Sequence, residues 1–161
     1  MLELRPVPYD HPDAQELTER AQAYYVELYG GRDDDPMTAD EFAAPRGGFV
    51  VGYLDGVPVA MGGWTAAEAG PGGRTAKIRR MFVEATARRH GLAGAVLQRL
   101  EAEAAAAGVR SMVLATGRPQ QAAIAFYRRH GYADIPAFGY YADSDQVVCL
   151  GKTLGAGQPT S

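Results

Sequence analysis

The residues best suited to chemistry form one short segment, 88–94, which reads RRHGLAG and stands at the start of an expected helix. A helix N-terminus exposes backbone N–H groups that have no intrahelical acceptor, together with the positive end of the helix dipole. Small residues in the first turn, here Gly91, Ala93 and Gly94, let an anion approach that backbone. Three side chains that donate hydrogen bonds lie at the same end: Arg88, Arg89 and His90. The segment therefore predicts a binding site for a diphosphate.

The same segment has plainer interpretations. An arginine-rich turn before a helix is more often a solvated surface. It is not a Walker loop, because no Gly-Lys-Ser/Thr follows, and it lacks the three glycines of a dinucleotide-binding turn. A small nucleic-acid-binding domain would be retained on DNA or RNA in a steeply salt-dependent way. The net charge of −3, from 16 basic and 19 acidic residues, argues against that class.

The composition indicates a soluble globular protein. Its 161 residues, 47% hydrophobic and 22% charged, suffice for one core and exclude a disordered or fibrous chain. No apolar run approaches the roughly 18 residues of a membrane span, and no signal-peptide pattern opens the chain, so a cytoplasmic protein is expected. Cys149 is the single cysteine, in an apolar strand run, and is expected in the core, as Trp64 is there or in a pocket wall. His11 and His130 are isolated and no pair has metal-ligand spacing, so no metal is expected.

The elements that must position the diphosphate segment follow from apolar periodicity, caps and turns. Helices are expected over residues 11–29, 38–45, 92–108 and 120–130. Strands are expected over residues 2–7, 48–54, 57–64, 77–83, 111–115 and 146–153. This order predicts an α/β fold with a mixed sheet and helices packed on it, in one domain over residues 1–154 with a flexible tail at 155–161.

Local signals support these boundaries. Gly30 and Gly31 end the first helix, and Thr38 with Glu41 forms a capping box for the second. The dipeptide 55–56, Asp-Gly, joins two β-rich runs and predicts a hairpin. Two glycines at 62–63 make a β-bulge plausible in the second strand of that hairpin.

Two motifs in order along the chain resemble those of the GCN5-related N-acetyltransferase (GNAT) family. Residues 88–93 are similar to the family's Gln/Arg-x-x-Gly-x-Gly/Ala signature, and the strand end at 81–83, MFV, precedes them as in the family. Residues 123–127, AIAFY, with Gly-Tyr at 131–132, are similar to the family's Ala-Ile-x-Leu-Tyr and Gly-Phe segment. Two such blocks at the right separation are far more specific than either alone.

The resemblance covers most of the chain and implies a fold. Residues 47–63 are similar to the family's central hairpin, and Thr-Gly at 116–117 with Gln120 is similar to a bacterial subgroup reading TG-x-x-Q. The implied architecture is a single-domain GNAT fold, with a mixed sheet of about six to seven strands and helices on both faces. Two neighbouring parallel strands, one ending at Val83 and one beginning at Ser111, are expected to splay apart.

The resemblance also implies a cofactor, acetyl-coenzyme A (acetyl-CoA), lying between the splayed strands. Backbone groups of Met81 and Val83 would pair with its pantetheine amides, the amides of 89–94 would hold its pyrophosphate, and Gln120 would hydrogen-bond the pantetheine arm. The residues expected to bind the cofactor are Met81, Phe82, Val83, Arg88, Arg89, His90, Gly91, Leu92, Ala93, Gly94 and Gln120.

Tyr127 would, by the same resemblance, donate a proton to the departing thiolate of coenzyme A. The chemistry permits this, since a phenol of pKa about 10 is neutral at pH 7 and can protonate a thiolate as it forms. The alternative is a core tyrosine that packs its helix against the sheet. Replacement by Phe separates the two roles.

The match departs from the family at the general base. Many relatives carry Glu near the start of the strand that leads to the pyrophosphate loop, and Lys77 stands there in this chain. Glu84 is the nearest carboxylate in sequence, but it follows the strand and is expected to be a surface residue. The base is therefore unassigned, which favours a less basic acceptor amine or a route through water.

The acceptor is expected to be a small-molecule amine. In the family its pocket is built by segments that correspond to 29–42 and 135–145. Asp33–Asp35 could give an acidic rim, with aromatic walls from Phe138, Tyr140 and Tyr141 and a further carboxylate from Asp143, which would suit a cationic amine. A run of Asp in a loop is otherwise simply solvated.

These observations predict an N-acetyltransferase that transfers acetyl directly from acetyl-CoA to a primary amine in a ternary complex. The alternative is a catalytically inactive sensor of acyl-CoA, or a scaffold, and the absence of the usual Glu supports it. No nucleic-acid or membrane partner is expected. Dimers are common in the family, so a homodimer involving the strands near Cys149 is an open alternative.

Overall fold

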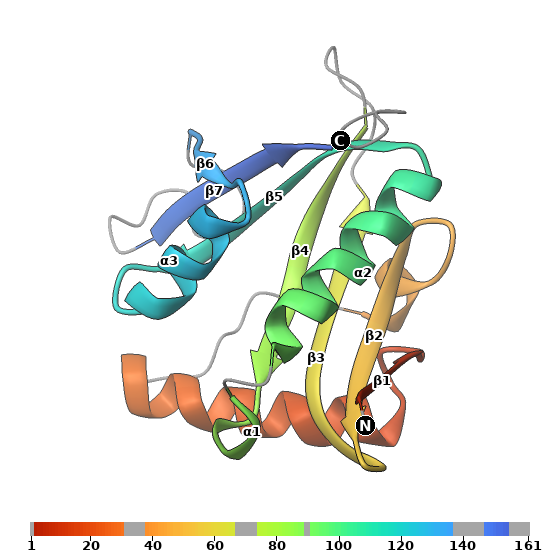
Figure 1. The fold of residues 1–161 in the computed structure, drawn as a ribbon, viewed down its shortest axis with the longest axis vertical. Helices are drawn as coiled ribbons and strands as arrows, with labels where there is room; N and C mark the ends of the chain where they lie inside the picture. The colour runs from red at the N-terminus through yellow and green to blue at the C-terminus, as the bar shows by residue number, and fades with distance from the viewer. Residues whose placement is uncertain (1, 31–37, 67–73, 89–90, 137–146, 155–161) are drawn as a thin grey trace.

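The computed structural model describes residues 2–30, 38–66, 74–88, 91–136 and 147–154 (Figure 1). The helices are α1 (Pro12–Tyr29), α2 (Leu92–Ala106) and α3 (Gln121–Arg129), with 3-10 helices η1 (Ala39–Phe42) and η2 (Ala85–Ala87). The strands are β1 (Leu2–Pro6), β2 (Gly47–Leu54), β3 (Val57–Ala66), β4 (Arg74–Val83), β5 (Val109–Gly117), β6 (Ala133–Asp134) and β7 (Val147–Thr153).

The described strands form one seven-stranded sheet in the order β1-β2-β3-β4-β5-β7-β6. All neighbours are antiparallel except β4 and β5, which are parallel. The mixed sheet predicted from the sequence is confirmed. Two strands begin two or more residues earlier than predicted, β4 at Arg74 and β5 at Val109. The short exposed β6 was not predicted, because two residues carry no periodicity.

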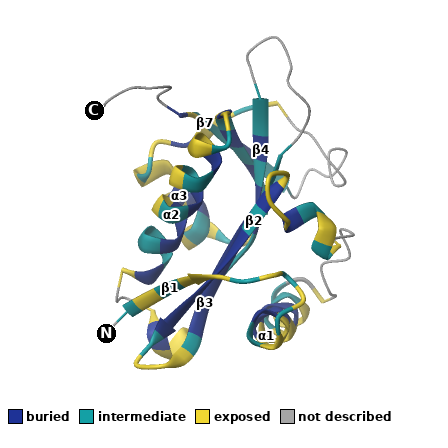
Figure 2. Cartoon of the chain, turned by 90° about the vertical axis from the view of Figure 1, so that its right-hand side faces the viewer, coloured by how far each residue is buried: buried dark blue, intermediate teal, exposed yellow. Residues whose placement is uncertain are grey.

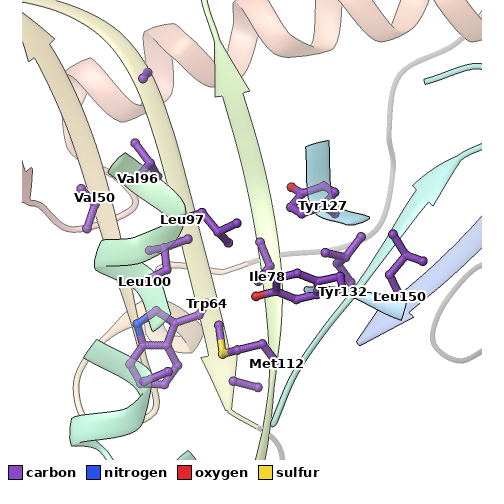
Figure 3. Close-up of a cluster of buried hydrophobic side chains, with 14 of the residues drawn as sticks. Val50, Trp64, Ile78, Val96, Leu97, Leu100, Met112, Tyr127, Tyr132 and Leu150 are labelled. Carbon is purple, nitrogen blue, oxygen red and sulfur yellow. The ribbon is translucent and has the colours of Figure 1, made fainter. Parts of the chain in front are cut away.

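Helices cover both faces of the sheet, as predicted. Figure 2 shows α2 and α3 on one face and α1 on the other. The core is accordingly split into two clusters of buried side chains. The cluster beside α2 includes Ile78, Leu97 and Met112, which Figure 3 labels. The cluster beside α1 includes Leu17 and Phe49.

The predicted caps are present at the ends of the first elements. His11 precedes α1, and its Nδ1 accepts a hydrogen bond from the backbone N–H of Asp13 at 3.0 Å. Gly30 ends α1 with φ of 80°, a conformation that disfavours residues with a β carbon. The Thr38 N–H donates to Glu41 Oε2 at 3.0 Å, which confirms the capping box, although the element that it starts is a 3-10 helix.

A β-bulge interrupts the pairing of β3 with β4. Met61 pairs with Phe82 and Gly63 with Arg79, so two residues of β4 lie opposite Gly62. One of these two β4 residues is Arg80, whose φ of 58° is unusual for a residue other than glycine. The glycines predicted a bulge here, and the structure places its additional residue on the partner strand.

The parallel strands β4 and β5 separate after a short stretch of pairing. They pair only between residues 74–77 of β4 and 109–113 of β5. β4 nevertheless stays paired with β3 as far as Val83, and β5 with β7 as far as Gly117. The splayed parallel pair is therefore confirmed, and residues 78–83 of β4 keep one backbone edge that does not pair with β5.

Gly62 sets how closely α2 approaches the sheet beside that edge. A β carbon on Gly62 would lie 2.6 Å from Sδ of Met81 and 2.8 Å from Cγ1 of Val96, on α2. Both distances are shorter than van der Waals contact, so a side chain here would push α2 away from β3 and β4.

Gly62→Ala is therefore expected to lower the free energy of unfolding by about 1–3 kcal/mol through overpacking. Gly94→Ala is the matched control, because its β carbon would meet Cε1 of His130 at an ordinary 3.6 Å. Alanine also favours the helix over glycine by roughly 0.5–1 kcal/mol. Urea unfolding measures both variants, and equal stabilities would show that α2 is not packed against Gly62 as described.

Candidate active site

The end of β4 presents backbone groups at the unpaired edge. The Glu84 N–H donates to Val59 O at 2.8 Å, so Glu84 turns its backbone toward β3. Because backbone groups alternate along a strand, those of Val83 and Met81 point away from β3. Met81, Phe82 and Val83 are all half-buried. The backbone groups of Met81 and Val83 therefore face the splay, while those of Phe82 face β3.

The first turn of α2 follows this edge through η2. Gly91 precedes the helix with φ of 74°, and among the described residues outside its own turn no atom would lie within 4 Å of a β carbon placed on it. The first helical hydrogen bond runs from Ala95 N to Gly91 O at 3.1 Å, so the N–H groups of residues 92–94 have no acceptor within the helix. Leu92 is 2% exposed and can offer a ligand only its backbone. Arg89 and His90 lie outside the described residues.

Arg88 connects the end of β4 with α1. Its Nε donates to the carbonyl oxygen of Val83 at 3.1 Å, and its guanidinium carbon lies 5.8 Å from the centre of the Tyr24 ring. One turn earlier on α1, Arg20 forms an ion pair with Glu84 at 3.1 Å. These contacts fix the chain between β4 and α2 against α1. The sequence showed neither contact, because about 60 residues separate the partners along the chain.

His130 lies beside the first turn of α2. A β carbon on Gly94 would be 3.6 Å from Cε1 and 3.8 Å from Nε2 of His130, and the imidazole packs on the ring of Phe126 with centroids 4.6 Å apart. His130 was expected to be isolated. Its spacing of three residues from Tyr127, which places both on neighbouring turns of α3, was the available signal.

Tyr127 projects from α3 toward the space between β4 and the β5–β7 pair (Figure 3). It is 6% exposed. Burial, and next the electrostatic interaction with Tyr25 of α1, raise the pKa of the Tyr127 phenol far above its ordinary value. The hydroxyl therefore stays protonated at neutral pH and can donate a hydrogen bond. Tyr25 was not predicted as a site residue.

A polar contact behind Tyr127 holds its surroundings in place. Tyr132 donates to Glu101 Oε2 of α2 at 2.7 Å, and Lys152 of β7 lies 3.2 Å from the same carboxylate. The rings of Tyr127 and Tyr132 meet edge to face with centroids 5.7 Å apart. Burial and the hydrogen bond to Glu101 raise the pKa of the Tyr132 phenol, so the hydrogen bond from Tyr132 to α2 persists to high pH.

Gln120 stands immediately before α3, on the β5 side of the splay. Its N–H donates to Gly117 O at 2.9 Å, and its carbonyl accepts from Ile124 N at 3.1 Å. The side chain is half-buried. The splayed strands therefore carry predicted residues on both arms, with Met81 and Val83 on one and Gln120 on the other.

The position expected to hold a general base carries a cation. Lys77 is half-buried and pairs in register with Thr65 of β3 and Val113 of β5. Two residues further on, Arg79 is 8% exposed and its Nη1 lies 3.4 Å from Glu41 Oε1 of η1. The structure thus places a lysine and an arginine on β4 where the strands begin to separate.

Trp64 and Cys149 are buried, as predicted. Trp64 is 3% exposed and its indole N–H donates to Glu103 at 3.3 Å, which places it in the core. Cys149 is buried. The described part of the chain contains no group of three or more His, Cys, Asp or Glu side chains that could hold a metal ion. No helix in the described segments is long and apolar enough to cross a membrane.

Comparison with known proteins agrees with this geometry. Residues 14–132 match the model of the acetyltransferase (GNAT) family. The chain belongs to that family. It is also 32% identical over 139 residues to an IAA acetyltransferase of Azospirillum brasilense, an alignment that covers 86% of this chain and 89% of that protein. The prediction of an acyltransferase that uses acetyl-CoA is thereby confirmed.

Solved GNAT structures share the fold at low identity. A Klebsiella pneumoniae protein described as an acyl-CoA N-acyltransferase superposes with a TM-score of 0.79 at 23% identity, over 96% of this chain and 98% of that one. The PaiA N-acetyltransferase of Thermoplasma acidophilum, solved in complex with coenzyme A, gives a TM-score of 0.70 at 12% identity, over 95% and 99% of the two chains. At these identities the likeness establishes the fold.

The raised pKa of Tyr127 gives a prediction for alkaline titration. Because its phenol stays protonated well above the ordinary value of about 10, Tyr127→Phe is expected to leave the absorbance change at 295 nm unaltered up to about pH 11. The measurement compares the variant with the parent protein under identical conditions. The chain has nine tyrosines. If the variant lost the contribution of one of them to the absorbance change, the Tyr127 hydroxyl would be solvated instead.

Proposed function

We propose that this GNAT enzyme transfers the acetyl group of acetyl-CoA to a primary amine of a small-molecule acceptor, by direct attack in a ternary complex. The observation that carries the proposal is one juxtaposition. The unpaired edge of β4, the open first turn of α2 and the Tyr127 hydroxyl border the same splayed pair of strands. Together they offer an edge for an extended amide chain, an anion site and a proton donor.

The cofactor follows β4 in this proposal. The backbone groups of Met81 and Val83 pair with the pantetheine amides, so the ligand extends the sheet where β5 has turned away. Phe82 keeps this segment in place, since its side chain packs in the α1-side cluster. Gln120 hydrogen-bonds the pantetheine arm from the β5 side.

The diphosphate lies at the first turn of α2. The N–H groups of Leu92, Ala93 and Gly94 point out of the N-terminal end of the helix and have no helical acceptor. The described surroundings of Gly91 are open, which lets phosphate oxygens come close. The side chains of the preceding turn add charge: Arg88, Arg89 and His90. The contact of Arg88 Nε with Val83 O occupies one of its donors and leaves its Nη groups for phosphate.

Tyr127 acts on the leaving group. The neutral amine attacks the thioester carbon, the tetrahedral intermediate collapses with cleavage of the C–S bond, and the departing sulfur takes the phenolic proton. The attacking nitrogen loses its proton to water, which also restores the proton on Tyr127. Burial raises the pKa of the phenol, so Tyr127 carries its proton at neutral pH when the sulfur departs.

A second candidate is a sensor that binds acyl-CoA without transferring it. The observation in its favour is Lys77 of β4. By the family resemblance, many relatives have at this position a glutamate that acts as general base. Release of free thiol from acetyl-CoA in the presence of an amine panel separates the two functions, because a sensor binds the cofactor and releases none.

Cofactor binding is tested by charge at the anion site. Ala93→Glu places a carboxylate in the first turn of α2, where it favours the helix dipole but repels a diphosphate. We expect coenzyme A to bind this variant at least tenfold more weakly by calorimetry. Gln98→Glu, an exposed position on the same helix, is the control and should bind normally. At a hundredfold excess over its Kd, coenzyme A should stabilise the parent protein by about 2.7 kcal/mol. If coenzyme A bound both variants equally well, the diphosphate would not lie at the first turn of α2.

The acid role is tested by Tyr127→Phe. We expect kcat to fall about 10²-fold, the lower range for loss of general acid catalysis, while the affinity for acetyl-CoA changes less than twofold. Tyr9→Phe controls for loss of one hydroxyl, since Tyr9 packs against Phe42 and Phe49 in the other cluster. Steady-state thiol release measures both, and an unchanged kcat in Tyr127→Phe would mean that water or the substrate protonates the sulfur.

A further inference from the structure

We propose that His130, at the end of α3, is a further cofactor-binding residue whose Nε2 donates a hydrogen bond to the diphosphate at the first turn of α2. The inference deepens the proposed function and rests on it, because it adds a side chain to the same cofactor site. It concerns the cofactor alone, since the acidic and aromatic segments expected at the acceptor pocket, 33–35 and 138–143, lie outside the described residues.

The end of α3 is docked along one face of α2, on the same side of the sheet (Figure 2). Gly94 and Glu101 are seven residues apart on α2, which is about two turns, so they lie on the same face of that helix. Tyr132 donates to Oε2 of Glu101 at 2.7 Å. The imidazole of His130 lies against Gly94, two turns nearer the start of the helix. The buried Tyr132 thereby holds His130 at a fixed place beside the N-terminus of α2.

The imidazole lies within reach of a phosphate bound by the first turn. Nε2 of His130 would be 3.8 Å from a β carbon on Gly94, and a β carbon is about 2.5 Å from the nitrogen of its own residue. Nε2 is therefore at most about 6.3 Å from the Gly94 nitrogen, whose N–H has no acceptor within the helix. A hydrogen bond to phosphate spans about 2.9 Å, and two oxygens of one phosphate are about 2.5 Å apart. One phosphate can thus accept from both donors.

The direction of the contact places the imidazole at the open end of the helix. The bond from Cα to Cβ tilts toward the N-terminus of an α-helix, so the atoms around the β-carbon position of Gly94 lie beside the first turn. Gly94 and His130 are both half-buried, and Gly91 is exposed. A ligand that approaches the first turn from solvent therefore meets the imidazole at the same place.

A histidine is chemically suited to this position. One nitrogen of a neutral imidazole donates a hydrogen bond, and both nitrogens of the protonated form do. A hydrogen bond to a charged phosphate oxygen is stronger than one between neutral groups. The ring of Phe126, with its centroid 4.6 Å from that of His130, supports the imidazole from α3, so less side-chain freedom is lost when a ligand binds. His130 therefore adds a pre-positioned side-chain donor to the backbone donors of α2.

This contact joins the two arms of the splay through the cofactor. The first turn of α2 follows β4, whereas α3 follows β5. A diphosphate held by both helices fixes their relative position. Because Tyr127 lies on α3 one turn before His130, the same contact aligns its hydroxyl with the bound thioester.

Variants that separate the donor from the ring test this inference. His130→Phe keeps an aromatic ring on Phe126 without a donor, and His130→Gln keeps an N–H donor without the ring. We expect the Kd of coenzyme A, measured by calorimetry, to rise about tenfold in His130→Phe and less than threefold in His130→Gln. Arg128→Gln is the control, because it removes an exposed cation from the same turn, whose guanidinium pairs with Asp134 at 2.8 Å, and it should bind as the parent does.

Dephospho-coenzyme A, which lacks the 3′-phosphate, locates the contact. The loss in His130→Phe should be the same with both coenzymes, because both carry the diphosphate. Three results would each overturn the inference: a loss confined to coenzyme A, an unchanged affinity in His130→Phe, or a loss in His130→Gln as large as in His130→Phe. Melting of each unliganded variant verifies folding, with His130→Leu in place of a Phe variant that does not fold. Failure of the parent protein to bind coenzyme A would instead refute the proposed function.

Discussion

The site depends on the separation of two parallel strands. After the last register pair, Lys77 with Val113, β4 and β5 diverge, and the backbone groups of residues 78–83 lose the neighbour that a continuous sheet would supply. Backbone N–H and C=O groups require partners, so an unpaired parallel edge inside a fold is suited to an extended ligand rich in amides. The rest of the structure keeps this edge open, because β3 holds β4 and β7 holds β5 on separate arms.

Three further features act on the same edge. The bulge opposite Gly62 adds a residue to β4, and the small size of Gly62 lets α2 pack closely over Met81. Arg88, just before the turn that leads into α2, is hydrogen-bonded to the end of β4, which holds the proposed anion site close to the unpaired edge. The buried link between Tyr132 and Glu101 fixes the packing of α3 that places Tyr127 at the splay.

Several features of the fold could be predicted from local sequence patterns. The ends of α1, the capping box before η1 and the hairpin turn follow from residue types that act on their own backbone, so nearby sequence suffices to predict them. The start of α2 at Leu92 was predicted on the same basis. Other features were not readable. The early start of β4 at Arg74 depends on pairing with β5, and the extra residue of the bulge lies on β4 although the glycines that indicated a bulge lie on β3.

The sequence by itself determined the family and the order of the elements other than β6, because short motifs and caps encode these within a few residues. Only the tertiary structure decided what surrounds them. Tyr25 beside Tyr127 and Glu41 beside Arg79 are pairs that lie far apart in the chain. Their proximity comes from the packing of α1 and η1 on the sheet, a long-range arrangement set by burial of the whole core and not by any local pattern.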